Sequence, residues 1–558
     1  MLELEASCLT PEPVLKASGH VDKFSDLMVK DAVTGTCYRA DHLLRDHLVS
    51  LLQDTQSDLT QGQREEIEAL RERLDELSQK EMDEMLSMYG AKAPETSNAL
   101  TPAYPFNLMF ATQIGPSGLL PGYLRPETAQ GIFVNFKRLL EYMGGKLPFA
   151  CAQIGLSFRN EISPRAGLLR VREFQQAEIE HFVNAEDKTH PKFGNIRDVK
   201  INMYGRSQQM RPPYKPIVTS IGAAVDEGII ANETLGYFIG RTAVLVDKIG
   251  MKWEHVRFRQ HLEHEMAHYA SDCWDLEINC SYGWVECAGL ADRSAFDLGN
   301  HSEKSGQELT AREVYAEPRH REVLAAIPNK GLLGRTFKKD AQTIMKSLAS
   351  MEEAELLALQ AALASKGKAS VIGFEVTKDQ ITFKVEKRTE TGRNYYPSVI
   401  EPSFGVGRLL YCLWEHCYYV REGGEGEDGS AIRAVLGLRP SMAPVKCAVL
   451  PLSKNALFED MVKEVGQLLG RAGLINRVDD SGQSIGRRYA RADEIGTPFG
   501  ITVDFKSTED RTVTVRERDS TKQIRCTIEN AVETIRELVA ERKTWAQVCD
   551  QFGVIEDV

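Results

Sequence analysis

The sequence has none of the features that would place the protein in a membrane or outside the cell. It contains no run of eighteen apolar residues, so no segment is predicted to cross a bilayer. Its first residues, MLELEASCLTPEP, include no basic stretch followed by an apolar one, and they are too acidic for a transit peptide. We therefore expect a cytosolic protein without a membrane segment.

Paired cysteines and surplus positive charge are also missing. The eleven cysteines include no CxxC pair, which predicts reduced thiols rather than disulfides or a structural zinc site. Cys273, Cys280 and Cys287 are evenly spaced, but buried reduced cysteines explain this spacing at least as well as metal ligands do. The net charge of −12 argues against a protein that coats nucleic acid non-specifically, although a local basic patch could still bind RNA.

The length of 558 residues predicts several domains, or one large domain with insertions. We expect short strands and turns over 1–50, where prolines and a glycine interrupt the chain. Apolar residues then recur at helical spacing among charges over 63–89, which predicts an amphipathic helix within an insertion at about 50–100. A solvated helix without chemistry is the simpler interpretation of that pattern.

The second half of the chain changes composition three times. A more polar stretch at about 301–395, with a Leu/Ala-rich helix near 351–365, predicts a second insertion. The run GGEGEDGS at 423–430 is typical of a loop or linker. Over 441–558 a buried strand, KCAVLPL, is followed by alternating helix and strand patterns, which predict a small α/β domain. This domain carries a local basic cluster of three arginines, Arg487, Arg488 and Arg491.

The most informative stretch is FACAQIGLSFRNEISPRAGLLRVREFQQAEIEHF at 149–182. It predicts two strands joined by a loop with four charged residues on its flanks, Arg159, Glu161, Arg170 and Arg172. Guanidinium groups bind phosphate oxygens bidentately, so this loop suits a nucleoside triphosphate, with Phe174 placed to stack on a purine. Taken alone, the pattern fits a surface hairpin with ion pairs equally well.

A second group of polar residues lies in EPSFGVGR, where a strand runs through glycines into an apolar helix. Gly405 and Gly407 allow a tight turn and a close approach of the backbone to a ligand. Arg408 falls in the first turn of the helix, where backbone N–H groups add positive potential. Together with Glu401 and Ser403, these residues indicate a second part of an anion-binding site.

Two further carboxylates are candidates with simpler alternatives. Glu127, in YLRPETAQGIF, precedes an apolar helix and could serve as its N-terminal cap. Glu286, in SYGWVECAG, alternates with Trp284 on a predicted strand, where an acidic side chain is usually solvated or paired.

The segment HEMAH at 264–268 matches the HExxH pattern of zinc peptidases, in which two histidines one helical turn apart bind zinc. His261 adds a third imidazole nearby. The pattern is short, and neither the HxxGxxH extension nor a helix with a third ligand follows it. A zinc peptidase is therefore a remote alternative.

Stretches along nearly the whole chain resemble one enzyme family. FRNE followed by RVREF resembles motif 2 of the class II aminoacyl-tRNA synthetases, and EPSFGVGR resembles motif 3. Within that class, TPEPVLKASGHVDKFSDLMVKD, YLRPETAQGIF, RNEISPR, VREFQQAEIEHF, HYASDCWD and VIEPSFGVGR are similar to the eukaryotic-type glycyl-tRNA synthetases. SIGRRYARADEIGTPFGITVDF at 484–505 is similar to their anticodon-binding domain.

The resemblance implies an α+β protein that activates glycine with ATP and Mg²⁺ and transfers it to tRNA(Gly). A class II catalytic domain, built on an antiparallel sheet flanked by helices, is expected over 1–440, with the two insertions inside it. The α/β anticodon-binding domain is expected over 441–558. The family also implies a homodimer.

The resemblance further implies a role for each matching residue. ATP is expected to contact Arg159, Asn160, Glu161, Arg170, Val171, Glu286, Cys287 and Arg408, and to stack on Phe174. Arg159 and Arg408 are expected to be the catalytic residues, whose positive charge stabilises the phosphates during the reaction. Glycine is expected to contact Glu127, Glu178, Glu401, Pro402 and Ser403. Glu286 and Glu401 are the candidate carboxylates near the Mg²⁺ of ATP.

The sequence departs from the family pattern at its start. Family members carry a glycine-rich segment and the long motif 1 helix, a dimer-interface element, before the strand that matches Leu2–Leu9. We therefore expect the chain as given to dimerise poorly. The same departure motivates one alternative function, a synthetase-like protein that binds tRNA or partners without catalysis. The presence of Arg159, Glu161 and Arg408 argues against that alternative.

Overall fold

The structure is a computed structural model that describes residues 1–53, 60–74, 77–162, 164, 166–267, 269–421 and 433–555. The predicted linker at 423–430 lies outside these residues. The chain folds into two compact units, one formed by Met1–Leu309 with Pro397–Val558 and the other by Thr310–Tyr396. Within the described part of the chain, every helix is too short or too polar to span a lipid bilayer.

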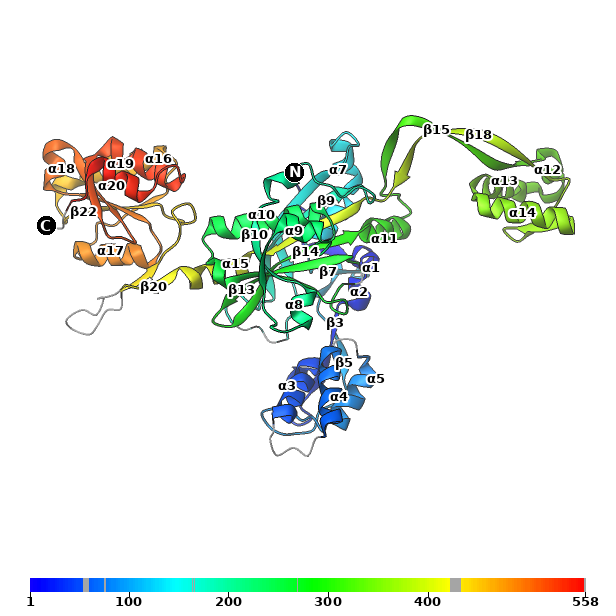
Figure 1. Ribbon diagram of the computed structural model, residues 1–558, viewed down its shortest axis with the longest axis horizontal. Coiled ribbons are helices and arrows are strands. Elements are labelled where there is room, and N and C mark those ends of the chain that lie inside the picture. Colours follow the sequence, from blue (N-terminus) through cyan, green and yellow to red (C-terminus); the bar gives the residue numbers. More distant parts are fainter. Residues whose placement is uncertain are drawn as a thin grey trace. The chain divides into compact units, whose positions relative to one another are not determined.

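A nine-stranded sheet forms the centre of the larger unit (Figure 1). The six central strands are antiparallel, while β1 and β10 join in parallel. In spatial order the strands are β1 (Leu2–Glu3), β8 (Phe149–Phe158), β9 (Glu173–Val183), β19 (Ser398–Gly405), β14 (Gly283–Ser294), β13 (Asp272–Cys280), β12 (Val256–Gln260), β10 (Lys200–Tyr204) and β11 (Ile217–Ser220). This sheet confirms the predicted α+β class and the largely antiparallel catalytic domain.

Helices cover the two faces of this sheet unequally. On one face, α10 (Glu233–Ile249) and α15 (Val406–Cys417) bury a hydrophobic core that includes alternate residues of β13, Trp274, Leu276 and Ile278. On the other face, α6 (Ala129–Val134), α7 (Phe136–Tyr142) and α11 (Phe296–Ser305) cover only one end, over a cluster of phenylalanines. The uncovered part of this second face is where polar side chains gather.

Strand register explains that gathering. Successive pairings align one row of residues across six strands: Gln153, Glu178, Ser403, Gly289, Asp275 and Arg259. Because side chains alternate along a strand, residues two positions away from this row, such as Glu401 and Cys273, share its face. Residues distant in sequence therefore project into one space.

The N-terminal region differs from its prediction. Instead of only short strands and turns, residues 1–53 contain α1 (Glu12–Ala17), α2 (His20–Lys23) and the longer α3 (Ala40–Gln53), together with β2 (Leu9–Pro11), β3 (Ser25–Lys30) and β4 (Cys37–Arg39). The helix α3 forms because Leu43, Leu44 and Leu48 lie on one face and pack into a core. Prolines and glycines early in the segment masked this later periodicity.

The segment predicted as one helix over 63–89 forms two helices, α4 (Gln61–Glu72) and α5 (Gln79–Met88). Each begins with its own capping box, at Thr60 and at Ser78, so the second helix starts anew rather than continuing the first. Ile67, Leu70 and Met82 are buried with α3, which makes this region a small packed core and not a solvated helix.

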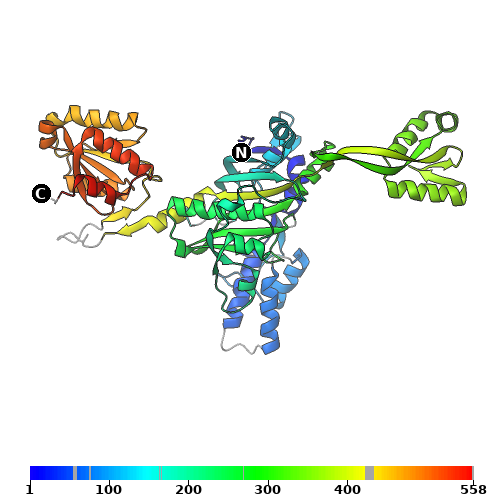
Figure 2. The ribbon, with the colours of Figure 1, turned by 45° about the horizontal axis from the view of Figure 1, so that its top comes forward.

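The smaller unit, Thr310–Tyr396, consists of a long two-stranded ribbon and a helical end (Figure 2). The ribbon pairs β15 (Ala311–Pro328) with β18 (Ile381–Tyr395). The end contains α12 (Lys330–Phe337), α13 (Ala341–Ser350), α14 (Glu353–Lys366) and the hairpin of β16 (Lys368–Val371) and β17 (Phe374–Thr377). These helices and strands enclose a core of their own.

The C-terminal part of the larger unit contains a separate five-stranded mixed sheet. Its strands, in spatial order, are β23 (Asn476–Val478), β22 (Cys447–Pro451), β24 (Phe499–Val503), β25 (Thr512–Glu517) and β26 (Gln523–Thr527). Five helices accompany it, α16 (Glu459–Arg471), α17 (Ile485–Glu494), α18 (Phe505–Asp510), α19 (Ile528–Val539) and α20 (Trp545–Phe552). A hydrophobic cluster drawn entirely from residues 447–548 fills it, as a small α/β domain requires.

The predicted basic cluster in this domain is smaller than expected. Arg488 is buried, and its guanidinium donates to the backbone carbonyls of Pro451, Leu452 and Asp479. Arg491 forms an ion pair of 2.9 Å with Asp479. Arg488 therefore stabilises the fold and is not available to a nucleic acid.

The remaining strands form small sheets around the core. β5 (Tyr104–Asn107) pairs with β3. β7 (Leu120–Leu124) lies between β2 and β6 (Ala111–Ile114) and pairs with both, and β20 (Tyr418–Val420) pairs with β21 (Ala434–Leu436). Two short helices, α8 (Arg206–Met210) and α9 (Ile221–Asp226), follow β10 and β11.

Candidate active site

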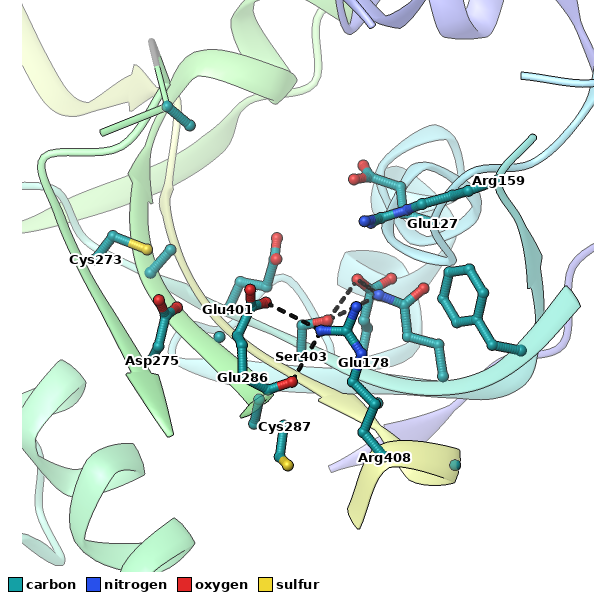
Figure 3. Close-up of a pocket in the computed structure, with 18 of the residues that line it drawn as sticks. Glu127, Arg159, Glu178, Cys273, Asp275, Glu286, Cys287, Glu401, Ser403 and Arg408 are labelled. Carbon is teal, nitrogen blue, oxygen red and sulfur yellow. Dashed lines mark hydrogen bonds and ion pairs between the residues drawn. The ribbon is translucent and has the colours of Figure 1, made fainter. Parts of the chain in front are cut away.

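A cavity of about 300 Å³ opens on the polar face of the nine-stranded sheet. Of the site residues predicted from the sequence, all except Asn160 and Pro402 line it. Carboxylates gather at one end around Glu127, Glu178 and Glu401, and Arg159 and Arg408 point into the same space (Figure 3). The cavity thus has an acidic part and a basic part.

Glu178 is the most firmly held carboxylate of the acidic part. One of its oxygens accepts hydrogen bonds from the backbone N–H groups of Thr128 and Ala129, at 2.6 and 2.8 Å, and from the Thr128 hydroxyl at 2.6 Å. The other oxygen accepts from Gln176 Nε2 at 2.7 Å and from the Ser403 hydroxyl at 2.9 Å. Five donors therefore fix one side chain at the start of α6.

This arrangement corrects the cap assigned to Glu127. The carboxylate at the N-terminus of α6 is that of Glu178, which comes from β9, while the helix cap itself is Thr128. Glu127 instead accepts from Gln130 Nε2 at 2.8 Å and lies 3.3 Å from His20 Nε2. Burial alone would raise the pKa of Glu127, but His20 and Arg293 hold it below its usual value.

Arg293 is a buried residue that forms ion pairs with several of the acidic residues. Its side chain is only 1% exposed, and it makes a two-point ion pair with Asp297 at 2.8 and 3.0 Å. It also pairs with Glu401 and lies 3.8 Å from Glu127. The rings of Tyr269 and Phe133 contact its guanidinium plane, with centroids at 4.1 and 5.4 Å.

Glu401 differs from Glu127 in the direction of its pKa shift. Burial, together with the neighbouring Glu178 and Glu127, raises the pKa of Glu401 to about 8, although Arg293 acts in the opposite direction. Burial likewise raises the pKa of Glu178, with Glu127 adding to the rise. Close carboxylates in a dry site resist simultaneous ionisation, so a cation entering this cavity would be strongly favoured.

The basic part is built from the hairpin of β8 and β9 and from α15. The guanidinium of Arg159 lies between two rings, 5.5 Å from the centroid of Phe24 and 5.4 Å from that of Phe174. Arg408 donates to the backbone carbonyls of Leu169 and Glu286, at 3.2 and 2.8 Å. Both guanidinium groups are thus positioned by neighbours and still face the cavity (Figure 3).

The remaining predicted residues have varied surroundings. The Glu286 carboxylate is exposed and lies 4.0 Å from Arg408, and Arg170 lies 3.9 Å from Glu161. The backbone N–H of Asn160 donates to Leu108 at 2.7 Å. Pro402 alternates with Glu401 and Ser403 on β19 and pairs with Leu290, so it does not share their face.

The evenly spaced cysteines do not form one group. The Cys287 sulfur lies 3.8 Å from that of Cys412 on α15, whereas Cys273 is near His261 and Asp275. All eleven cysteines are free thiols, as predicted.

The HEMAH segment does not have the geometry of a zinc peptidase in the residues described. His264 and Glu265 lie in a turn rather than on a helix, and His268 lies outside the described residues. The Glu265 carboxylate is taken by Arg259, at 2.6 and 2.7 Å, and by the Leu262 N–H at 2.9 Å. This glutamate is therefore not positioned as a general base beside a helical histidine pair.

Comparison with known proteins shows the family to which this chain belongs. Residues 122–417 match the model of the tRNA synthetase class II core domain (G, H, P, S and T), and residues 446–538 match the anticodon binding domain. The Glycine–tRNA ligase of Drosophila melanogaster is 49% identical over 100% of this chain and 72% of its own length. The chain belongs to the glycine–tRNA ligase family of class II synthetases.

Other members of the glycine–tRNA ligase family show similar agreement. The protein from Bombyx mori is 48% identical over 100% of this chain and 75% of its own length, and that from Methanocaldococcus jannaschii is 43% identical over 97% and 89%. A solved prolyl-tRNA synthetase from Cryptosporidium parvum aligns at 13% identity with a TM-score of 0.42, covering 78% of this chain and 62% of that chain. A score that low does not bear on the fold. As a class II synthetase, the chain uses ATP as a substrate.

The sequence analysis missed the buried residues that hold the carboxylates of this synthetase site in place. Arg293 and Asp297 lie four residues apart in ADRSAFDL, and Gln130 bridges Glu127 and Asp297. An arginine followed four positions later by an aspartate was a visible signal. Nothing local indicated that both would be buried beside Glu401.

Proposed function

We propose that this chain joins glycine to tRNA(Gly) in two steps. The glycine carboxylate attacks the α-phosphorus of ATP in line, which forms glycyl-adenylate and releases pyrophosphate. The terminal ribose hydroxyl of the tRNA then takes the glycyl group and AMP leaves. The single observation that carries this proposal is one cavity with a carboxylate end and a guanidinium end, in a chain of this family.

The acidic end supports binding of the glycine ammonium group. Glu127 and Glu178 supply the carboxylates, and the Ser403 oxygen, which already bonds to Glu178, adds a third acceptor. Glu401, which forms an ion pair with Arg293, lines the cavity beside these groups. An ammonium group favours such a site because it relieves repulsion between buried acids.

Rigid carboxylates also offer a physical basis for selecting glycine. The correct substrate is smaller than every competing amino acid, so selection depends on excluding a side chain rather than on filling a pocket. Glu178 cannot move aside for an extra methyl group without losing five hydrogen bonds. Exclusion by a fixed wall discriminates more strongly than the loss of one methylene from a hydrophobic pocket, about 1–3 kcal/mol.

The basic end supports binding of the ATP phosphates. We assign Arg159 to the α-phosphate and Arg408 to the γ-phosphate, because guanidinium groups fixed before the reaction stabilise charge as it develops. Phe174 is assigned to the adenine ring, and Asn160, Glu161, Arg170, Val171 and Cys287 complete the nucleotide site. Since no covalent enzyme intermediate is needed, positioning and charge account for the catalysis.

Glu286 suits the Mg²⁺ of ATP better than Glu401 does. The Glu286 carboxylate is 58% exposed and free to take an oxygen-ligated cation, whereas Glu401 is buried and paired with Arg293. Glu286 would hold Mg²⁺ at this position, and the cation would neutralise part of the negative charge of the ATP phosphates. The homodimer implied by the family and the cytosolic location stay predictions.

The two halves of the reaction can be separated by truncation. We expect a variant that lacks residues 445–558 to keep glycine-dependent ATP–pyrophosphate exchange within a few-fold but to charge tRNA at least about tenfold more slowly. The reason is that residues 447–548 fill a core of their own, while Ala443 still packs in the core of the large sheet. The rates of exchange and of tRNA charging, measured on the full chain and the truncated one, decide this.

Two outcomes of the truncation experiment would contradict this expectation. If the truncated chain is folded by circular dichroism and charges tRNA as fast as the full chain, the C-terminal domain does not contribute to tRNA binding. If it is folded but has lost exchange, the C-terminal domain takes part in glycine activation and the two half-reactions do not separate at this point.

A further inference from the structure

A second group of metal-binding side chains lies in the wall of the same cavity. Donor atoms of His261, Cys273 and Asp275 all lie within 4.8 Å of one another. Cys273 and Asp275 are two residues apart on β13 and therefore share its cavity face, and Figure 3 shows them side by side. His261 follows β12 directly, and its backbone N–H donates to Cys273 at 2.9 Å, which fixes the ring nearby.

We propose that His261, Cys273 and Asp275 form a site for a divalent transition cation, Zn²⁺ or Co²⁺. Thiolate, imidazole and carboxylate are the three ligand types that zinc takes in proteins, and three protein ligands leave one tetrahedral position open. At the usual bond lengths, ligand atoms around zinc lie roughly 3.2–3.7 Å apart. Since the donor atoms lie within 4.8 Å of one another, shifts of about 1 Å bring the cluster to this spacing.

Metal binding requires only a small local change. His261 Nε2 and Asp275 Oδ2 share a hydrogen bond of 2.8 Å, so the cation would replace the shared proton and widen this distance by roughly half an ångström. Cys273 binds as a thiolate, so its thiol proton is released to solvent together with the shared proton. Among the described residues, the buried Nδ1 of His261 has no hydrogen-bond partner, so the ring can adjust without breaking a second bond.

The surrounding charges do not oppose a cation. The guanidinium of Arg259 is 4.0 Å from Asp275, but Glu265 neutralises it with two hydrogen bonds. Glu277, which pairs with Arg257, and the exposed Glu286 lie on the neighbouring positions of β13 and β14. The charged groups facing Asp275 therefore balance or favour added positive charge.

The open position of the metal faces the cavity. Gly289 lies between Asp275 and Ser403 in the same row of the sheet, and no atom lies within 4 Å of where its Cβ would be. Water or a substrate atom can complete the coordination there. Because thiolate and imidazole select zinc-like cations, this site differs from the oxygen-ligated Mg²⁺ site at Glu286.

Titration of the full chain with Co²⁺ tests the proposal, since cobalt bound to a thiolate gives a charge-transfer absorption band. We expect one equivalent to bind with this band. Cys273→Ser should abolish the band and weaken binding by at least about 100-fold, the upper limit for losing a group that only hydrogen-bonds to a metal ligand. Cys280→Ser is the matched control, because Cys280 is also half-buried on β13 and should leave the band unchanged.

A second pair of variants keeps the test decisive if Cys273→Ser folds poorly. His261→Gln should weaken Co²⁺ binding, whereas His264→Gln, in the same turn but exposed, should not. The proposal is wrong if the wild-type chain gives no thiolate band. It is equally wrong if folded Cys273→Ser and His261→Gln bind Co²⁺ like the wild type, or if His264→Gln removes the site. These readouts do not depend on glycine activation.

Discussion

Replacing Arg293 with methionine is expected to destabilise the catalytic part of the chain by about 3–5 kcal/mol and to raise KM for glycine. Arg293 is buried and balances Asp297 and Glu401, so its removal leaves buried carboxylates without a partner. Methionine keeps most of the side-chain volume, which limits the loss of packing. Urea unfolding followed by tryptophan fluorescence measures the stability, because Trp274 lies in the core of this sheet.

The control for Arg293 is the same substitution at an exposed ion pair. Arg197 pairs with Asp226, and both side chains are about half exposed. Arg197→Met should change stability by less than about 1 kcal/mol and leave KM for glycine unchanged. If Arg293→Met unfolds at the same urea concentration as Arg197→Met and binds glycine normally, Arg293 does not support the carboxylates of the acidic part of the cavity.

Replacing Arg159 with alanine is expected to slow glycine-dependent pyrophosphate exchange by about 100-fold or more. A fixed charge that acts on the transition state contributes about 2.7–4 kcal/mol to catalysis in comparable sites. The loss should appear in kcat for exchange more than in KM for glycine, because Arg159 is assigned to the α-phosphate and not to the glycine ammonium group. Circular dichroism should remain native.

Arg172→Ala provides the matched control for Arg159. Arg172 is the last residue of the same hairpin loop, and its side chain is exposed. Its Nε donates to the Glu161 carbonyl at 3.0 Å, and it does not line the cavity. Its replacement should change exchange by less than about threefold. Equal activity of the wild type and a well-folded Arg159→Ala variant would show that Arg159 does not hold the α-phosphate.

Much of the site could be predicted because its residues fall in long ordered motifs. FRNE, VREFQQAEIEHF and EPSFGVGR placed Arg159, Glu178 and Glu401 in one expected site, and the structure brings them to one cavity. Their roles toward ATP and glycine stay predictions. The cavity forms from strand register, and the sequence contains no direct record of which strands are neighbours.

Residues that act through long-range contacts could not be predicted in this way. Arg293 looks like one of many charged residues until β14 is paired with β19 and Glu401 lies beside it. The same holds for Cys273, whose partner His261 is close in sequence but belongs to a different segment. Spacing along the chain identified evenly placed cysteines, whereas the structure places Cys273 beside His261 and Asp275 and brings Cys280 and Cys287 to Cys412.

One error and one rejected alternative came from local patterns that packing overrides. The helix α3 has a clear set of leucines on one face, but prolines and a glycine earlier in the segment favoured strands and turns. HEMAH matches a helical metal motif, but Glu265 is held by Arg259 in a turn. The prediction for α3 was wrong because short signals early in the segment were given more weight than the contacts that decide the structure, whereas the HEMAH alternative was already set aside.

ATP–pyrophosphate exchange with each of the twenty amino acids in turn, without tRNA, tests the central claim most directly. We expect exchange with glycine and none above background with alanine or serine, because the side chain of either would meet the fixed carboxylate of Glu178. Aminoacylation of added tRNA with the same amino acids should show the same preference. Exchange that responds to another amino acid and not to glycine would contradict the proposed function.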